Sequence, residues 1–455
     1  MRTRVLLLCG VVLIACAALG RMMATSSSSD AASGETILYT AAKQYDALAW
    51  MRGGERFPQG ATIIVKDGKQ AQALVSGFFA TADPDFSFDG KSVLFAGKKT
   101  ASSPWQIWEM AFPGGTPHQI ATGPEDAVRP LHLPEDVVVF AKKQSGRFVI
   151  ESIPLSGGKP FRLTFTPASV MPTDVLRDGR ILFEAGYPLG SGTTPEIYTV
   201  YSDGSGVESY RCDHGAGRYA AKQVGNGDIV FTHGKGLARF TSPLAHEVAV
   251  GAPAGEYSGD VVETASGDWL ISWHAGATGN FELRRWKAGD GSATTIAAEA
   301  GANVLQPAIA QARPVPNRHP SGLHDWTASN LMSLNSYLSK YKFAKGSIAS
   351  VRVYTTDKMG KPKVLGNAPV EKDGSFYVHV PGDQPIKFEL LDSTGKTLKK
   401  QGGWMWTRGG EQRICVGCHT GPERAPDNVV PEVLLRSTDP VDMTGAKPKS
   451  QTGGK

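Results

Sequence analysis

The residues best suited to chemistry lie near the end of the chain, in the segment Cys415-Val416-Gly417-Cys418-His419. Two cysteines three positions apart can both add to the vinyl groups of one porphyrin, and the histidine that follows can reach its iron. With five cysteines and ten histidines in 455 residues, chance would produce this pattern in about one such sequence in a thousand. The motif predicts one covalent haem c, attached to Cys415 and Cys418, with His419 as an axial ligand.

Two other chemistries use paired cysteines. A structural zinc site needs four ligands, and no second cysteine or histidine pair follows Cys418. A thioredoxin-type dithiol is expected in a βαβ setting, whereas the residues before this motif alternate like strands. Both stay open as alternatives to haem. Cys212 stands alone near His214; we expect a buried or spare thiol there, with a metal role as the alternative.

Aromatic and basic residues before the motif suit a haem pocket. Trp404 and Trp406 can cover a porphyrin face or edge, and the last strand of a domain core is the alternative for both. Arg408 and Arg413 can pair with the haem propionates, because guanidinium donates two parallel hydrogen bonds to a carboxylate. Solvated surface arginine is the alternative for these two.

The sixth position of the iron has several candidate ligands. Met405 lies close to the motif, and Met443 lies far enough beyond it to loop over the ring. His319 and His324 can reach in from a preceding domain. None of the four is favoured over an open or weakly ligated iron, so carrier and catalyst both remain hypotheses.

A degenerate repeat must hold this motif in place. Residues 36–312 repeat with a period of about 42 to 48 residues, the length of one four-stranded propeller blade. Each repeat centres on a short apolar strand, and Asp-Gly turns precede several of these strands. The pattern predicts a six-bladed β-propeller that is closed by a strand from Val304 to Ala310, with five or seven blades as the alternatives. The anchor strands are 92–95, 137–140, 180–183, 228–231 and 269–273.

A second, smaller domain follows the proline-rich break at residues 313–320. Alternation at 348–354 and the Asp373-Gly374 hairpin predict a small β-sandwich over 313–436, which carries the haem motif. Residues 330–341 fit a short helix or an extended segment. The polar residues 437–455 are predicted to be a disordered tail. The fold class is therefore mainly β.

The start of the chain is typical of an export signal. A basic start and sixteen apolar residues precede two competing cleavage sites. Residues 1–16 end in a lipobox-like segment in which Cys16 becomes lipidated, and Ala18-Leu19-Gly20 is the alternative site. Residues 17–35 are predicted to be a flexible tether. We expect an exported, periplasmic protein, with a lipid anchor in the outer membrane if Cys16 is modified.

Charge narrows the choice of partners. The formal net charge is +5, and 48 basic and 43 acidic residues are spread along the chain. This balance does not predict binding to nucleic acid. We expect a redox partner, either a protein or a small molecule.

Residues 365–376, 388–392 and 409–419 resemble the haem-bearing middle domain of the hydrazine synthase alpha subunit family. Residues 83–91 resemble the repeat of TolB-like propellers, and a preceding propeller also belongs to that family's architecture. The resemblance implies the fold and the haem. In the synthase, a tyrosine four residues past the motif histidine binds the catalytic iron, and that histidine turns to zinc. Here the position is Glu423, and no domain for a second haem is expected, so the resemblance does not imply hydrazine synthesis.

Three functions remain open. The first is an exported monohaem c-type cytochrome that transfers electrons or binds redox partners, with the propeller as a docking platform. The second is a haem enzyme with an open iron site, which acts on a small nitrogen or oxygen compound. The third is a propeller scaffold with a structural haem.

Overall fold

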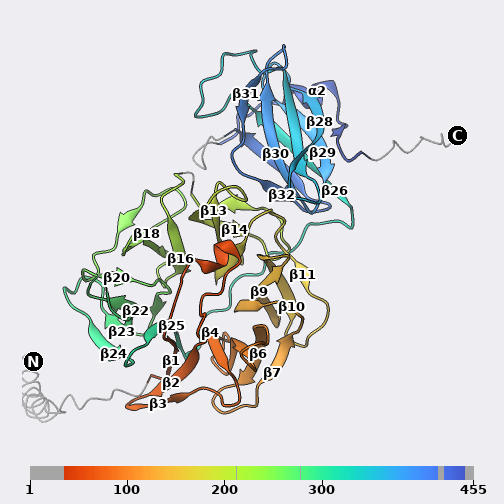
Figure 1. Ribbon diagram of the computed structural model, residues 1–455. Helices are drawn as coiled ribbons and strands as arrows, with labels where there is room; N and C mark the ends of the chain where they lie inside the picture. The colour runs from red at the N-terminus through yellow and green to blue at the C-terminus, as the bar shows by residue number, and fades with distance from the viewer. Residues whose placement is uncertain (1–34, 212, 277, 419–424, 446–455) are drawn as a thin grey trace, which may run out of the picture.

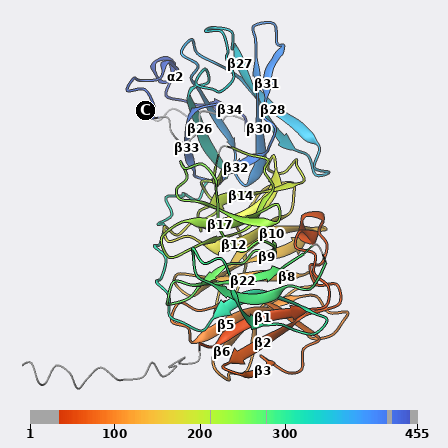
Figure 2. The same ribbon diagram turned by 90° about the vertical axis from the view of Figure 1, so that its left-hand side faces the viewer.

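Almost all regular structure in this protein is β-strand, arranged in two units (Figures 1 and 2). The computed structural model describes residues 35–211, 213–276, 278–418 and 425–445. The described helices are the 3₁₀ turn η1 (Ala49–Arg52) and α2 (Glu432–Arg436). No described helix is long and apolar enough to cross a membrane.

The first unit consists of six antiparallel sheets that follow one another around a common centre (Figure 1). Five sheets are built from strands that are consecutive in the sequence. The remaining sheet joins both ends of the region, because β25 pairs with β1 as the sequence predicts. This pairing closes the ring and protects strand edges that would otherwise be open.

The strands of these six sheets are β25 (Asn303–Ile309), β1 (Ile37–Ala42), β2 (Thr62–Asp67) and β3 (Gln70–Ala73); β4 (Ala80–Phe86), β5 (Ser92–Lys98), β6 (Gln106–Ala111) and β7 (His118–Ala121); β8 (Ala127–Leu133), β9 (Val137–Gln144), β10 (Arg147–Pro154) and β11 (Phe161–Arg162); β12 (Val170–Val175), β13 (Ile181–Tyr187), β14 (Thr194–Val200) and β15 (Glu208–Ser209); β16 (Arg218–Gln223), β17 (Ile229–His233), β18 (Gly236–Phe240) and β19 (Val248–Ala249); and β20 (Glu256–Tyr257), β21 (Val262–Glu263), β22 (Trp269–His274), β23 (Glu282–Trp286) and β24 (Thr294–Ala297).

The centre of the ring is filled by charged and polar side chains from different parts of the first unit, here named the axial cluster: Arg56, Asp83, Arg129, Asp260 and Gln306. Four of its members, all except Arg56, have φ between 52° and 57°, a left-handed conformation that is strained for these residue types. Register shifts beside Asp83 and Arg129 show that their inner strands bulge there. The segment between β1 and β2, which includes η1, lies over the middle of the ring (Figure 1).

The second unit is a β-sandwich whose two sheets share one apolar core. Leu331 and Val378 pack from one sheet against Val351 and Ile386 from the other. One sheet contains β33 (Gln412–Gly417), β26 (Ala328–Asn335), β29 (Phe376–Pro381) and β34 (Val441–Asp442), and the other contains β28 (Pro362–Pro369), β27 (Ser350–Thr356), β30 (Gln384–Leu391), β31 (Thr397–Lys400) and β32 (Met405–Thr407).

Two segments of the sandwich differ from the sequence-based expectation. The sequence predicts a short helix or an extended segment at residues 330–341. The first part of this segment is extended, because residues 328–335 form strand β26. The predicted tail at 437–455 is ordered in its first part: β34 pairs with β29, and Met443 is buried. The reason is that Val441 and Met443 cover the apolar edge of the sandwich core, a contact that the polar local sequence does not reveal.

The sandwich rests against the propeller beside β13 and β14 (Figures 1 and 2). Trp406 is the centre of this junction: it is fully buried, packs against Phe183, and donates from Nε1 to the carbonyl oxygen of Gly204 at 2.9 Å. The Trp404 backbone N–H donates to the Leu189 carbonyl at 2.7 Å. These contacts fix the sandwich against one rim of the propeller.

Candidate functional site

Strand β33 carries the first cysteine of the motif at the edge of the sandwich. It runs parallel to β26, with Cys415 opposite Ser333 and Gly417 opposite Asn335. Alternate residues of a strand share a face, so Arg413 and Cys415 lie on the same side. This one face of β33 therefore contributes to both of the cavities described below.

The first cavity, here named the thiol cavity, has a volume of about 230 Å³. Both cysteines line it, and both are half-buried. Most of its other walls are apolar side chains from the sandwich core. Its lining residues are Leu331, Ser333, Phe376, Phe388, Leu390, Lys399, Gln401, Met405, Cys415, Gly417 and Cys418.

Cys418 is held in this cavity by its backbone and by its surroundings. Its N–H donates to the Leu338 carbonyl at 2.9 Å. Burial raises the pKa of its thiol to about 11, and the hydrogen bond with Ser336 offsets only part of that effect. A thiol with a raised pKa is a poor thiolate at neutral pH, which does not favour the dithiol alternative.

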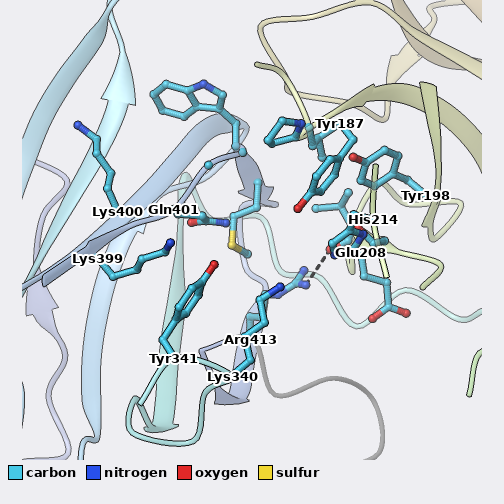
Figure 3. Close-up of a pocket in the computed structure, with 18 residues that line it drawn as sticks. Tyr187, Tyr198, Glu208, His214, Lys340, Tyr341, Lys399, Lys400, Gln401 and Arg413 are labelled. Carbon is cyan, nitrogen blue, oxygen red and sulfur yellow. Dashed lines mark hydrogen bonds between the residues drawn. The ribbon is translucent and has the colours of Figure 1, made fainter. Parts of the chain in front are cut away.

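The second cavity, here named the junction cavity, has a volume of about 340 Å³ and lies between the two units (Figure 3). The propeller contributes the end of β13, parts of β14 and β15, and His214. The sandwich contributes residues 340–341, 399–405 and Arg413. Figure 3 shows that the hydroxyls of Tyr187 and Tyr341 and the ammonium group of Lys399 point toward its middle.

The two cavities share part of their walls, because Lys399, Gln401 and Met405 line both. Close approach of the units depends on Gly403. A Cβ at this position would lie 2.9 Å from the Leu189 backbone nitrogen and 3.1 Å from its oxygen. A side chain there would have to push the propeller rim away from the sandwich.

The predicted haem-pocket residues Trp406 and Arg408 line neither cavity. Trp406 is enclosed by the propeller core at the junction. Arg408 donates from Nε to Asp383 at 2.6 Å and from Nη1 to the Asp203 carbonyl, and it stacks on Phe161. Their polar groups already have partners, so the structure places both residues in the domain junction rather than at the thiols.

The other two predicted pocket residues lie closer to the thiols. Trp404 is buried in the wall of the junction cavity, where Lys387 lies 5.1 Å from the ring centroid. Arg413 lines the same cavity and donates from Nη2 to the Val207 carbonyl at 2.7 Å. Neither side chain lines the thiol cavity itself.

The two candidate methionine ligands are placed differently. Met405 is half-buried and lines both cavities. Met443 is 3% exposed and packs in the sandwich core. It lies so close to Gly366 that a Cβ added at that glycine would be 3.3 Å from the Met443 side chain. Of the junction histidines, His319 stacks on Tyr201 with ring centroids 3.7 Å apart, and His324 lies beside Trp326.

Several residues used in the sequence argument lie outside the described residues: Cys16, Ala18-Leu19-Gly20, Cys212, His419 and Glu423. Among the described residues there is no group of three or more histidine, cysteine or acidic side chains placed to hold a metal ion. The sequence argument did not find Tyr187, Tyr341 or Lys399, because no motif marks them and only the folded junction brings them together.

The residues present at the thiols fit a covalently attached haem. Two free cysteines open into the same cavity, and the cavity is apolar, as a porphyrin ring requires. Cys415 and Cys418 would hold the ring, and Phe376, Phe388 and Met405 would contact it.

A propeller joined to a β-sandwich is also the fold of a known synthase. The solved structure of Kuenenia stuttgartiensis hydrazine synthase superimposes with a TM-score of 0.77, over 88% of this chain and 71% of that chain, at 18% sequence identity. TolB from Acinetobacter baumannii gives a TM-score of 0.47 over 61% of this chain and 67% of that chain, at 15% identity. No curated protein sequence matches the chain.

Residues 333–420 match the family described as the hydrazine synthase alpha subunit middle domain. This segment includes β33 and the whole cysteine motif. The resemblance inferred from the sequence is confirmed: the chain is hydrazine synthase alpha-like in its middle domain and in its fold.

Proposed function

We propose that this chain is an exported monohaem c-type cytochrome that transfers electrons to or from a redox partner, a protein or a small molecule. The six sheets of the first unit would be the six blades of a propeller that serves as the docking platform. One covalent haem c would be bound to Cys415 and Cys418, with His419 as an axial ligand. The localisation would be periplasmic, with Cys16 as the site of a lipid anchor.

One observation carries this proposal: the two motif thiols line a single apolar cavity at the edge of the sandwich. Zinc would be expected among converging polar ligands, whereas Leu331, Phe376 and Leu390 surround these thiols. When bound there, a haem supplies a one-electron redox couple. The protein's own contribution is an apolar wall that excludes water and two fixed attachment points.

A haem enzyme with an open iron site is the second candidate. The placement of the methionines supports this candidate, because it leaves few methionines that could fill the sixth position of the iron. Met443 is enclosed in the sandwich core, so Met405 is the methionine among the described residues that lines the thiol cavity. The thiol cavity also shares three residues with the larger junction cavity. A small nitrogen or oxygen compound would have space beside the ring.

The experiment that tests attachment replaces both thiols. Cys415→Ala together with Cys418→Ala should abolish haem staining on a denaturing gel and lower the protein mass by about one haem. Ser333→Ala is the matched control, because Ser333 lines the same cavity but cannot form a thioether. Staining that survives the double substitution, or a wild-type mass without haem, would contradict the proposal.

Export and anchoring are tested separately. Wild-type protein should partition into the detergent phase, and Cys16→Ala should release it or block its processing. Mature protein that is soluble and begins at Arg21 would instead establish the alternative cleavage site.

A further inference from the structure

The junction cavity carries more positive than negative charge. Its lining includes Lys340, Lys399, Lys400 and Arg413, against one carboxylate, Glu208. Lys340 and Lys400 are exposed at its mouth, and Lys399 is half-buried. Glu208 forms an ion pair with Arg180 at 3.0 Å, which directs its charge toward the propeller. The net charge of the lining therefore favours an anion.

Lys340 and Lys399 form no ion pair with any carboxylate in the described part of the chain. Lys400 stands opposite Glu389 in the pairing of β30 with β31, and its charge helps to lower the pKa of that carboxyl. Lys399 lies 3.8 Å from the Tyr341 ring centroid and also hydrogen-bonds the Tyr341 hydroxyl, and Lys400 lies 4.3 Å from the ring centroid of Tyr354. Lys387 is a further cation nearby: burial lowers its pKa, and the charge of Lys400 lowers it further. Like charges held this close repel one another unless an anion joins them.

Arg413 is positioned for the same ligand. Its Nη2 is bound to Val207, but its buried Nη1 makes no hydrogen bond to any described residue. The nearest carboxylate oxygen, on Glu411, lies 3.6 Å from this nitrogen, too far for a hydrogen bond. A buried guanidinium nitrogen without a hydrogen bond is costly, and a carboxylate or oxyanion would satisfy it.

We propose that the junction cavity is an anion-binding site for carboxylate or oxyanion groups, formed by Lys399 and Arg413 with the hydroxyls of Tyr187 and Tyr341 (Figure 3), and that the exposed Lys340 and Lys400 of its lining add to its positive charge. Positive charge and hydroxyl donors converge on one space, which is the donor set that such anions take. The anion site itself does not depend on the proposed haem attachment. Only one of the two sources of the anion, the haem propionates, rests on that proposed function.

Two sources supply this chemistry. The first is the haem itself: its two propionates lie on the porphyrin edge opposite the vinyl groups that join the cysteines. A ring attached at Cys415 and Cys418 and directed through the thiol cavity would point that edge past Met405 into the junction cavity. The second source is a free small oxyanion that enters the junction cavity from solvent.

The test uses the full-length haem protein and the triple variant Lys340→Gln, Lys399→Gln, Lys400→Gln. Lys361→Gln is the matched control, because Lys361 is an exposed lysine of the sandwich that lines neither cavity. The two measurements are the midpoint reduction potential and the binding of inorganic phosphate by titration calorimetry.

If the propionates occupy the site, the triple variant should have a lower potential, because loss of positive charge near the haem favours ferric iron. We expect the reduction equilibrium constant to fall by about tenfold, which for a one-electron couple is about 59 mV. The Lys361→Gln control should leave the potential unchanged, since solvent and salt screen a distant charge. Wild-type haem protein should then not bind phosphate.

If a free oxyanion is the ligand, wild-type protein should bind phosphate, and the triple variant should bind it at least about tenfold more weakly. The anion site would be overturned if, in protein that carries haem, the triple variant kept the wild-type potential and wild-type protein bound no phosphate. It would also be overturned if Lys361→Gln changed the potential or the phosphate affinity as much as the triple variant does. If wild-type protein carries no haem, the proposed function fails instead, and phosphate binding by the haem-free chain still decides whether the cavity is an anion site.

Discussion

The axial cluster and the junction cavity both collect charged side chains, but the cluster pairs its arginines and aspartates with one another, whereas the cavity leaves Lys340 and Lys399 without an ion pair among the described residues. Arg56 lies 2.5 Å from Asp83, and Arg129 forms three bonds of 3.1 Å to Asp260 across the ring. Burial would raise the pKa of Asp83, yet the two arginines lower it below its usual range. In the junction cavity, Lys340 and Lys399 have no such partner among the described residues. Charge that is paired internally serves the fold, whereas charge left unpaired beside a cavity points to a ligand.

The largest expected effect comes from breaking the paired region. Arg56→Met keeps most of the side-chain volume but removes the positive charge that pairs with the buried Asp83 carboxylate. Removal of one partner of a buried ion pair costs about 3 to 5 kcal/mol. The free energy of unfolding, measured in urea, should fall by that amount.

The matched control adds Asp83→Asn to Arg56→Met. Asn tolerates the left-handed conformation of this position and can still accept the hydrogen bond from the Arg129 backbone. The double variant should recover part of the lost stability, because no uncompensated carboxylate remains. Equal stability of wild type and Arg56→Met would show that this pair is not a stabilising contact.

Glu184 provides a pH test of the same region. This carboxyl is 3% exposed, and its burial, only partly offset by the charge of Arg129, raises its pKa from 4.5 to about 7. The folded state therefore keeps a proton that the unfolded state releases, so stability falls as pH rises from 4.5 to about 7. The slope is about 1.4 kcal/mol per pH unit at most. Glu184→Gln, which mimics the protonated form, should remove this slope from the urea midpoints; an unchanged slope would assign it to other groups.

The sequence predicts much of the strand pattern for a local reason. Short apolar runs separated by Asp-Gly turns determine hairpins without help from distant residues, as at Ile181 to Phe183 after Gly179. The closing strand β25 was also predictable, because a ring of consecutive hairpins lacks one inner strand. The register of β34 on β29 was not, since two residues in a polar segment carry no periodic signal.

The candidate site was predictable only where one segment contains it. Cys415 and Cys418 follow from their spacing, and both line one cavity. Trp406 and Arg408 suit a porphyrin equally well by residue type, yet the propeller engages both through the carbonyls of Gly204 and Asp203. Those contacts join residues about two hundred positions apart, so no local pattern could have distinguished a haem-pocket residue from a junction residue.

A smaller effect distinguishes the two methionines. Met443→Leu keeps the volume of a side chain in the sandwich core and should cost less than about 1.5 kcal/mol. Because Met443 packs in that core, the visible spectrum of the haem protein should be unchanged. Met405→Leu is the comparison, since Met405 lines both cavities. Loss of a methionine–iron charge-transfer band in Met443→Leu would show that this residue reaches the iron.

The smallest expected change in stability comes from Lys399→Met, the same type of substitution as Arg56→Met but at the junction cavity. Lys399 is half-buried against Tyr341 and has no acidic partner among the described residues. Its removal therefore leaves no buried carboxylate without an ion pair. The loss of its contact with the ring is offset by relief of repulsion from Lys400 and Lys340. The free energy of unfolding of the chain without added anion should therefore change by less than about 0.5 kcal/mol. A loss as large as that of Arg56→Met would mean that Lys399 is part of the folded framework, and the contrast between the two regions would not hold.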